Sequence, residues 1–337
     1  MATARLATLI VWSLGVAVLI GLTLWSGAGL VGQAILDSGW AVAAVVLIRI
    51  SGVAGAGAGW WLLFPADIRP RLPALMGIRF IREATNAILP LAQIGGDFIG
   101  ARCLALRGTR GSVAAASVMV DVLVQAATMV AFALIGLTLL LVNGGSEIVA
   151  WSAGIGIGIA IPALAAFFVA QSEHGHRLIT KALTALAGGR EWRVFGAVDE
   201  LFAQLQRFYA NRIGLVRSFF WHLADWFVGV VEVWIVLNFM GYAISIEQAL
   251  IIESLMQAVR GAAFAIPGAL GAQEGGLIVL CAMYGIPPDA AVALSLVKRI
   301  PDFVIGIPGV LAWQAMEGRN FFRRSAARSQ TGGPERP

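Results

Sequence analysis

Long apolar stretches recur along the whole 337-residue chain and are separated by short polar loops. Roughly 20 apolar residues are enough for one helix to cross the hydrocarbon layer of a bilayer. Six stretches reach this length: residues 8–26, 38–64, 112–142, 148–170, 219–240 and 290–313. The pattern therefore predicts an all-α polytopic membrane protein with six transmembrane helices.

Two further apolar stretches, residues 72–104 and 247–284, are each divided near the middle by a proline. Pro90 divides the first stretch and Pro267 the second. Proline lacks the amide donor that a continuing helix needs, so each stretch is expected to form two short helices. Irregular backbone inside a bilayer is tolerated only where protein or water covers it.

Positive charge alternates from loop to loop and predicts the orientation. The loops at 27–37, 143–147, 241–246 and 285–289 contain no Lys or Arg, whereas the N-terminus, the other loops and the C-terminal tail hold 18 of the 24 basic residues. Cytoplasmic loops are enriched in Lys and Arg, so both termini are predicted to be cytoplasmic. Each divided stretch then begins and ends on one side of the membrane, which predicts two re-entrant helical hairpins.

Composition agrees with a membrane protein, since 59% of the residues are hydrophobic and 13% are charged. The pI near 9.9 does not indicate nucleic-acid binding, because the basic residues cluster in loops and no binding motif is present. Cys103 and Cys281 stand far apart in apolar stretches, and no second histidine lies at metal-ligand spacing from His222, so no disulfide and no metal site is expected. No Walker motif is present, and we expect no cofactor.

The two divided stretches share a pattern of polar residues. "PLAQIGGD" runs from Pro90 to Asp97 and "PGALGAQE" runs from Pro267 to Glu274, so each proline precedes a carboxylate by seven residues. An arginine lies shortly upstream in both stretches. Similar units in opposite orientations indicate an inverted-topology repeat, which builds a binding site near the bilayer midplane from interrupted helices. A chance similarity between two kinks rich in Gly and Pro is the alternative.

Charged side chains inside a membrane are costly and are candidates for function. Arg79, Arg82, Glu83 and Asn86 share one face of a helix by their spacing, and Arg79 with Glu83 forms an i,i+4 pair. Head-group binding and structural ion pairing are both open interpretations. The candidate substrate-binding residues are Arg79, Arg82, Glu83, Asn86, Gln93, Asp97, Arg260, Gln273, Glu274, Lys298, Arg299 and Asp302. No catalytic residue is predicted.

Other charges in the spans have structural interpretations. We expect Glu232 to pair with a Lys or Arg of another helix. Arg49 and Asp121 are lone charges on separate spans, and the sequence leaves open whether they pair or whether Arg49 reaches the membrane surface. Lys298 and Asp302 form an i,i+4 pair by their spacing. We expect Asp302, together with Glu274 or Glu253, to neutralise the positive charges of Lys298 and Arg299.

The stretch "IPGALGAQEGG", followed by "GIPP" at 285–288 and by Lys298-Arg299, resembles the flippase-like transmembrane domain of lysylphosphatidylglycerol synthases. "REATNAILPLAQIGGD" in the first half is similar to the same family, and the resemblance extends over residues 9–315. Because the chain ends after the last span, we expect a stand-alone member, with the hopanoid-biosynthesis-associated membrane proteins as one candidate branch. The resemblance implies movement of a lipid head group between leaflets of a bacterial inner membrane.

Three classes of function remain open. The first is a lipid flippase or transporter. Its phosphate charge would be offset by Arg82, Arg260, Lys298 and Arg299. A cationic group or a proton would be bound by Glu83, Asp97 and Glu274. The second is an integral-membrane enzyme acting on an isoprenoid or phospholipid with Glu274 or Asp97 as acid or base, although no known catalytic motif is present. The third is a scaffold for lipid-biosynthesis enzymes.

The predicted organisation is a transmembrane domain over residues 1–318, followed by a basic tail, 319–337, that is expected to be disordered. Residues 172–217 contain apolar positions at helical spacing and predict a cytoplasmic amphipathic segment. His174 and His176 lie in this segment and are expected to be solvated.

The charge pattern predicts which loops a membrane-impermeant thiol reagent reaches. In intact cells, single cysteines at Asn143 and Gly241 should react from outside, and cysteines at Arg107 and Arg190 should react only after the membrane is opened. Labelling of Arg107→Cys in intact cells would contradict the inverted repeat.

Overall fold

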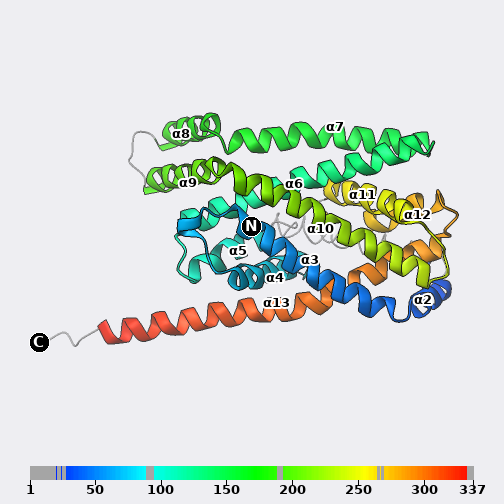
Figure 1. Cartoon of the computed structure of the whole chain (residues 1–337). Coiled ribbons are helices and arrows are strands. Elements are labelled where there is room, and N and C mark those ends of the chain that lie inside the picture. Colours follow the sequence, from blue (N-terminus) through cyan, green and yellow to red (C-terminus); the bar gives the residue numbers. More distant parts are fainter. Residues whose placement is uncertain are drawn as a thin grey trace, which may run out of the picture.

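The computed structural model describes residues 28–88, 95–187, 193–263 and 269–331, together with Ile20, Leu24 and Ile266. Within these residues the chain is helical and contains no strand, as the all-α prediction requires (Figure 1). The elements are α2 (Ala28–Asp37), α3 (Ala41–Leu63), η1 (Ala66–Ile68), α4 (Leu72–Ile88), α5 (Gly95–Leu106), α6 (Gly111–Val142), α7 (Glu147–Ala170), α8 (Glu173–Ala187), α9 (Arg193–Ala210), α10 (Arg212–Phe239), α11 (Ile246–Ala262), α12 (Ala272–Ala282) and α13 (Pro288–Thr331).

Four helices, α3, α6, α7 and α10, are long and apolar enough to cross a membrane, and each matches one predicted window. The window at 290–313 lies within α13, whose 44 residues include Pro301 and Pro308. The window at 8–26 falls almost wholly outside the described residues. Helix α13 also continues through 319–331, where the sequence analysis expects disorder, because this range contains no glycine or proline to end the helix.

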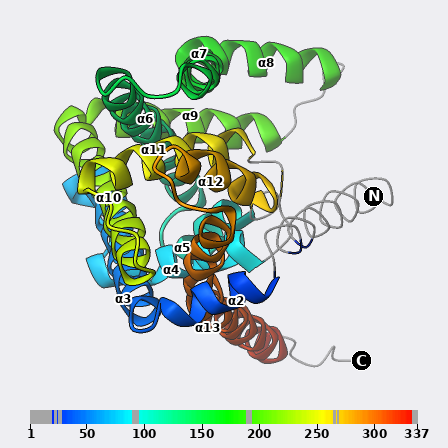
Figure 2. The same cartoon turned by 90° about the vertical axis from the view of Figure 1, so that its right-hand side faces the viewer.

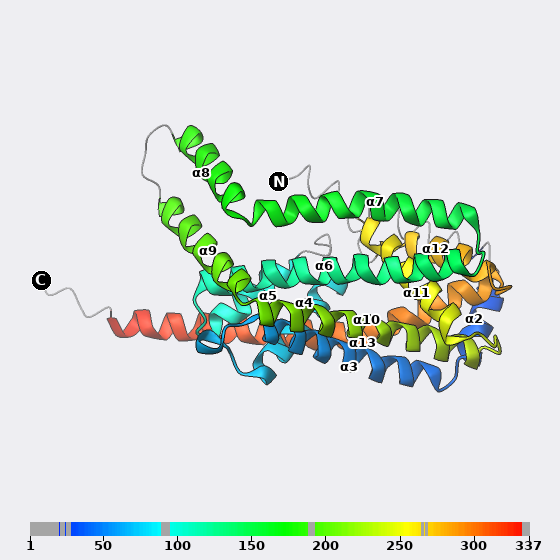
Figure 3. The same cartoon turned by 45° about the horizontal axis from the view of Figure 1, so that its top comes forward.

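The loops gather at two opposite ends of the bundle according to their charge. At one end, Asn143 donates a hydrogen bond from Nδ2 to Oε1 of Glu247 at 2.7 Å, which joins two loops without Lys or Arg. At the other end, Arg207 of α9 forms an ion pair with Asp67 of the basic 65–72 loop. Figure 3 shows the same separation, with α8, α9 and the C-terminal end of α13 opposite to α2.

Two helical hairpins lie within the bundle, one formed by α4 and α5 and the other by α11 and α12. Helices α4 and α11 have 17 residues each, whereas α5 has 12 and α12 has 11. At 1.5 Å per residue, α5 and α12 are about 18 Å long or less, which is too short for a hydrocarbon layer of about 30 Å. The turns of both hairpins, with Pro90 and Pro267, lie outside the described residues.

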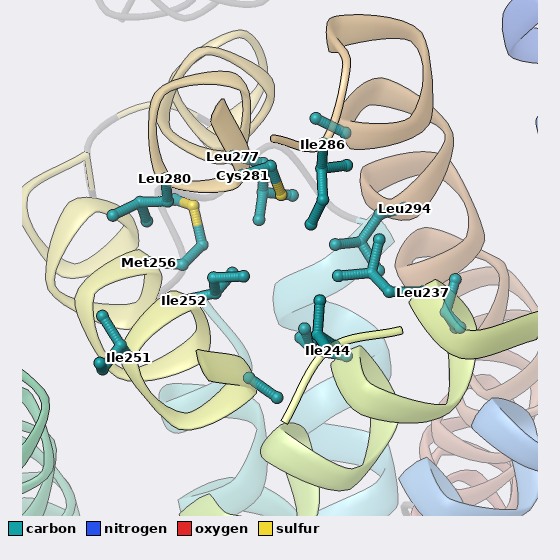
Figure 4. Close-up of a cluster of buried hydrophobic side chains, with 14 of the residues drawn as sticks. Leu237, Ile244, Ile251, Ile252, Met256, Leu277, Leu280, Cys281, Ile286 and Leu294 are labelled. Atoms are coloured by element: carbon teal, nitrogen blue, oxygen red, sulfur yellow. The ribbon is translucent and has the colours of Figure 1, made fainter. Parts of the chain in front are cut away.

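Two separate apolar cores occupy the two halves of the bundle. The first joins the start of α3 to parts of α6, α10, α11, α12 and α13, and it includes Leu237, Ile252 and Leu294 (Figure 4). The second joins the end of α3 to α4, α5, the start of α6 and α9, around Trp60 and Phe208. The charged residues of the spans lie between these cores, so the interior of the bundle has a polar layer at mid-length.

The helices at the periphery differ in how they pack. Helix α7 contacts α6, α11 and α8, and it lies at the edge of the bundle in Figure 2. The predicted amphipathic segment forms two helices, α8 and α9, and α9 buries Phe202 and Phe208 in the second core. His174 is exposed as expected, whereas His176 pairs with Asp199 of α9 at 2.7 Å and stacks on the ring of Phe202.

Close packing of α5 on α4 requires glycine at position 96. A Cβ at Gly96 would lie 2.2 Å from the carbonyl oxygen of Arg82, whereas a Cβ at the exposed Gly77 of α4 would meet nothing within 4 Å. We expect Gly96→Ala to lower the free energy of unfolding by roughly 1–3 kcal/mol through overpacking. Gly77→Ala is the matched control and should be neutral or slightly stabilising. Thermal unfolding of the purified protein in detergent measures both, and equal melting temperatures for the two variants would contradict the tight contact.

Candidate functional site

The first part of the polar layer is organised around Asp121 of α6, which is fully buried. Its Oδ2 accepts hydrogen bonds from Nη1 of Arg82 at 2.7 Å and from Nε2 of Gln125 at 2.7 Å, and it lies 3.3 Å from Nη1 of Arg79. Its Oδ1 lies 3.2 Å from Nε2 of His222 on α10. One carboxylate therefore ties α4 and α10 to α6, and the cluster is satisfied by charge and by hydrogen bonds together.

Arg82 also connects the two helices of the first hairpin. Its Nη2 and Nε donate to Oδ1 of Asp97 on α5 at 2.6 and 3.1 Å, and its guanidinium lies 4.8 Å from the centre of the Trp60 ring. Asn86 accepts a hydrogen bond at Oδ1 from the backbone N–H of Gly96 at 2.7 Å. The side chains of Arg82, Asp97 and Asn86 thus hold the hairpin together.

The second part of the polar layer is a chain of charges that links four helices. Lys298 of α13 pairs with Glu253 of α11 and lies 3.7 Å from Glu232 of α10. Glu232 in turn accepts a hydrogen bond from Nη2 of Arg49 on α3 at 2.7 Å. Gln257 donates to Glu253 at 2.7 Å. The expected partner for Glu232 is confirmed, and Arg49 pairs with Glu232 rather than with Asp121 or the membrane surface.

Glu274 lies at the start of α12 and is fully buried. Its Oε2 accepts a hydrogen bond from the backbone N–H of Gly271 at 2.7 Å. Its Oε1 accepts from Oγ of Ser295 at 2.6 Å and from Nε and Nη2 of Arg299 at 3.0 and 2.8 Å, while Gln273 donates to Ser295 at 2.9 Å. The carboxylate thus closes the backbone turn before α12 and fixes that turn to α13.

Charged residues occupy equivalent positions in the two halves, with exchanged signs at two positions and the same sign at a third. Arg79 and Glu253 are each the eighth residue of their helices, α4 and α11. Their partners, Asp121 and Lys298, are each the eleventh residue of α6 and α13. The carboxylates at 97 and 274 are each the third residue of the short second helix of a hairpin. Such a correspondence is what two related halves with reversed charges would produce.

A cavity of about 130 Å³ opens between the two clusters. Helices α3, α4, α6, α10 and α11 line it. Its charged lining consists of two guanidinium groups and four carboxylates, with one histidine: Arg49, Arg79, Glu83, Asp225, Glu232, Glu253 and His222. Carboxylates outnumber cations by two to one, so the cavity has an excess of negative charge when all four are ionised.

The predicted site residues are divided between paired and unpaired groups. Arg79 pairs with Glu83 at 3.4 Å, as the i,i+4 spacing predicts. The other predicted i,i+4 pair is wrong, since no ion pair in the described part of the chain joins Lys298 to Asp302, and Glu253 lies closer to the ammonium group. Arg260 and Asp302 have no hydrogen bond or ion pair among the described residues, and Gln93 lies outside them.

Sequence reasoning did not select several residues that line the cavity or complete the clusters. Asp121, Glu232 and Glu253 were noted only as structural charges, although they hold the layer together. Asp225 and Gln125 are absent from the candidate residues selected from the sequence. A polar residue at i,i+4 from Asp121 was the available signal for Gln125, because this spacing brings two side chains together on a helix.

Within the described residues, no group of three or more His, Cys, Asp or Glu side chains is placed to hold a metal ion. Cys103 and Cys281 are both buried and are not joined to each other. Charged and amide groups that face a small cavity in an otherwise apolar bundle are suited to a polar ligand.

The Glu274–Arg299 contact predicts the effect of removing one charge. Glu274→Gln should lower the free energy of unfolding by about 3–5 kcal/mol, because it leaves the Arg299 guanidinium without its carboxylate in a buried site. The double variant Glu274→Gln with Arg299→Met should regain much of this loss. Glu147→Gln, at an exposed carboxylate at the start of α7, is the control and should change little. Thermal unfolding in detergent tests all three, and no recovery in the double variant would contradict a paired charge.

Comparison with protein families agrees with the motifs. The model of the lysylphosphatidylglycerol synthase TM region matches residues 12–309, which include α3 to α12 and the charged part of α13. No curated protein and no solved structure matches the chain. The match extends over both hairpins and both charge clusters, and it supports a lipid-related role in a membrane. The chain therefore belongs to the family of the lysylphosphatidylglycerol synthase transmembrane region.

Proposed function

We propose that the protein is a lipid transporter that moves a polar-headed lipid between the leaflets of a bacterial inner membrane. The observation that carries the proposal is the charged cavity at mid-length of the bundle, between two apolar cores. A lipid head group needs polar surroundings to pass the hydrocarbon layer, while its tails remain in lipid. Because the family is lipid-related, a lipid is the polar ligand that fits this cavity best.

The two hairpins are proposed to be re-entrant and to form the path of the head group. Helices α5 and α12 are too short to span the hydrocarbon layer, and each hairpin begins and ends at the same end of the bundle (Figure 1). Interrupted helices placed in this way give substrate sites near the midplane in transporters with inverted repeats. The proposed topology puts the basic loops and both termini in the cytoplasm.

The charges of the site favour a head group that carries an ammonium. Three cations that were expected to offset phosphate charge are already neutralised, since Arg82, Lys298 and Arg299 all pair with buried carboxylates. The cavity instead presents more carboxylates than guanidinium groups. Ethanolamine and aminoacylated head groups supply the missing positive charge. Arg260 has no ion-pair partner among the described residues, but it does not line this cavity.

An enzyme acting on the same class of lipid is the second candidate. Glu274 and Asp97, the proposed acid or base, are both held in ion pairs, with Arg299 and Arg82 respectively. Neither carboxylate is among the residues that line the cavity, so neither is placed against a ligand bound there. The hairpin geometry therefore favours transport, and chemical identity of the lipid after incubation separates the two candidates. Membership of the hopanoid-associated branch is a further proposal that rests on the motifs alone.

Transport is tested in liposomes with lipids labelled on an acyl chain. The purified protein is reconstituted with fluorescent phosphatidylethanolamine, phosphatidylcholine or phosphatidylglycerol, and dithionite reports the fraction of label in the outer leaflet. We expect the protein to speed exchange of phosphatidylethanolamine by about tenfold or more over protein-free liposomes. Phosphatidylglycerol should move more slowly, because it lacks the ammonium group.

A matched pair of variants on α10 connects transport to the cavity. Val228 lines the cavity, whereas Val231 is exposed on the outer face of the same helix. Val228→Trp should reduce exchange by about tenfold by filling the cavity, and Val231→Trp should leave it near the wild-type rate. Exchange no faster than in protein-free liposomes would refute the transport function, and a lipid of altered mass after incubation would favour the enzyme.

A further inference from the structure

Asp225 of α10 differs from the other carboxylates that line the cavity. Glu83, Glu232 and Glu253 each pair with a cation. Asp225 has no hydrogen bond or ion pair within the described part of the chain, although it lines the same cavity. An ionised carboxylate inside an apolar bundle is costly unless it is neutralised. Asp225 therefore needs a positive partner or a proton.

Glycines of α3 bring Asp225 into the polar layer. A Cβ at Gly55 would lie 2.8 Å from Oδ1 of Asp225, and a Cβ at Gly52 would lie 3.6 Å from the same atom. Trp221, one turn earlier on α10, donates from Nε1 to the carbonyl oxygen of Gly55 at 2.7 Å. The close approach of α3 and α10 thus fixes the carboxylate at the edge of the cavity without giving it a donor.

The charges around Asp225 do not neutralise it. Its nearest charged neighbours come from α3, α4 and its own helix: Arg49, Arg79, Glu83, His222 and Glu232. Further charges of the layer come from α6, α11 and α13: Asp121, Glu253 and Lys298. The cations among them already bind other carboxylates.

The guanidinium groups nevertheless leave room for a ligand in the cavity. Arg79 is only 9% exposed, and its buried Nε has no hydrogen-bond partner; the buried Nε of Arg49 has none either. These two Nε atoms are not exposed to the cavity. The cavity instead offers an unpaired carboxylate beside two guanidinium groups, a surface that a zwitterionic group with an acceptor and an ammonium would complement.

We propose that Asp225 is the exchange site of a proton-coupled transporter, where a proton and the ammonium of a lipid head group compete for one carboxylate. In the empty cavity Asp225 carries the proton. When the ammonium enters, the O–H bond breaks, the proton passes to water in the cavity, and the carboxylate accepts a hydrogen bond from the ammonium. One positive charge replaces another, and no other covalent bond changes.

This exchange keeps the charge of the polar layer constant. The layer has the same net charge with Asp225 protonated as with Asp225 bound to an ammonium, so both states avoid an unpaired, partly buried carboxylate. An ionised, empty site is the costly state, and its cost prevents the protein from returning without a proton. The inference rests on the proposed transport function for its lipid, whereas the proton on Asp225 stands independently of it.

Infrared difference spectroscopy tests the proton without requiring transport. In nanodiscs of phosphatidylglycerol alone, which lacks an ammonium, the wild-type protein should show a protonated-carboxyl band at neutral pH. The band should lose intensity in Asp225→Asn but not in Asp225→Glu. Asp302→Asn removes another carboxylate without a partner among the described residues, and it should leave the Asp225 part of the band in place. Inclusion of phosphatidylethanolamine should reduce the band in the wild type. A band of unchanged intensity in Asp225→Asn, or the absence of any band in the wild type, would overturn the proposal.

Proton flux in liposomes then tests the coupling. With a pH-sensitive dye inside and an imposed pH difference, liposomes containing phosphatidylethanolamine should show protein-dependent proton movement, which should fall by about tenfold in Asp225→Asn. Labelled lipid that moves without any proton movement would overturn the coupling and leave the transport function in place. A carboxyl band assigned to Asp225 without movement of any lipid would refute the transport function and leave the proton site in place.

Discussion

The structure depends on one constraint: a charge buried in an apolar bundle must be neutralised close to where it lies. An uncompensated ion in this environment costs several kcal/mol, far more than any single apolar contact contributes. The chain nevertheless places a dozen or so charged residues at mid-length of its helices, between two apolar cores. The relative positions of the helices therefore follow from the pairs that these residues form.

Most of these pairs connect different helices, and this gives the layer its organising role. Asp121 brings α4 and α10 to α6, while Lys298 brings α10 and α11 to α13. Arg49 carries α3 into the second cluster through Glu232. Each cluster thus includes a long helix from the other half of the chain. These ion pairs connect the two halves of the chain and oppose their separation. A cavity remains where the two clusters meet.

The position of the cavity is consistent with a lipid-related family and with a polar ligand. A bundle with only apolar contacts would exclude a lipid head group, and a bundle with a continuous polar channel would leak ions. Here a small charged cavity lies in a bundle that also holds two apolar cores. The hairpins supply the helix starts of α5 and α12 near this layer, where Asp97 and Glu274 fix them by ion pairs. Among the carboxylates that line the cavity in the described part of the chain, Asp225 has no cation partner, and a ligand or a proton can satisfy it.

The sequence by itself determined the features that depend on neighbours along the chain. The apolar windows predicted α3, α6, α7 and α10 to within a few residues at most ends, because spanning length and the absence of charge are local properties. The i,i+4 spacing likewise predicted the contact between Arg79 and Glu83, since a helix brings these side chains together whatever surrounds it. The alternation of basic loops predicted the two ends of the bundle.

The tertiary structure alone decided which charges meet. Lys298 shares a helix face with Asp302, but Glu253 and Glu232 from other helices lie beside its ammonium group, so the local pair does not form. Arg299 rather than Lys298 binds Glu274, and Arg49 binds Glu232 rather than Asp121. Spacing along one helix determines which side chains share a face, but it does not determine which residues of other helices that face contacts. The partner depends on packing between helices, and here the glycines of α3 set how closely Asp225 of α10 approaches the cavity.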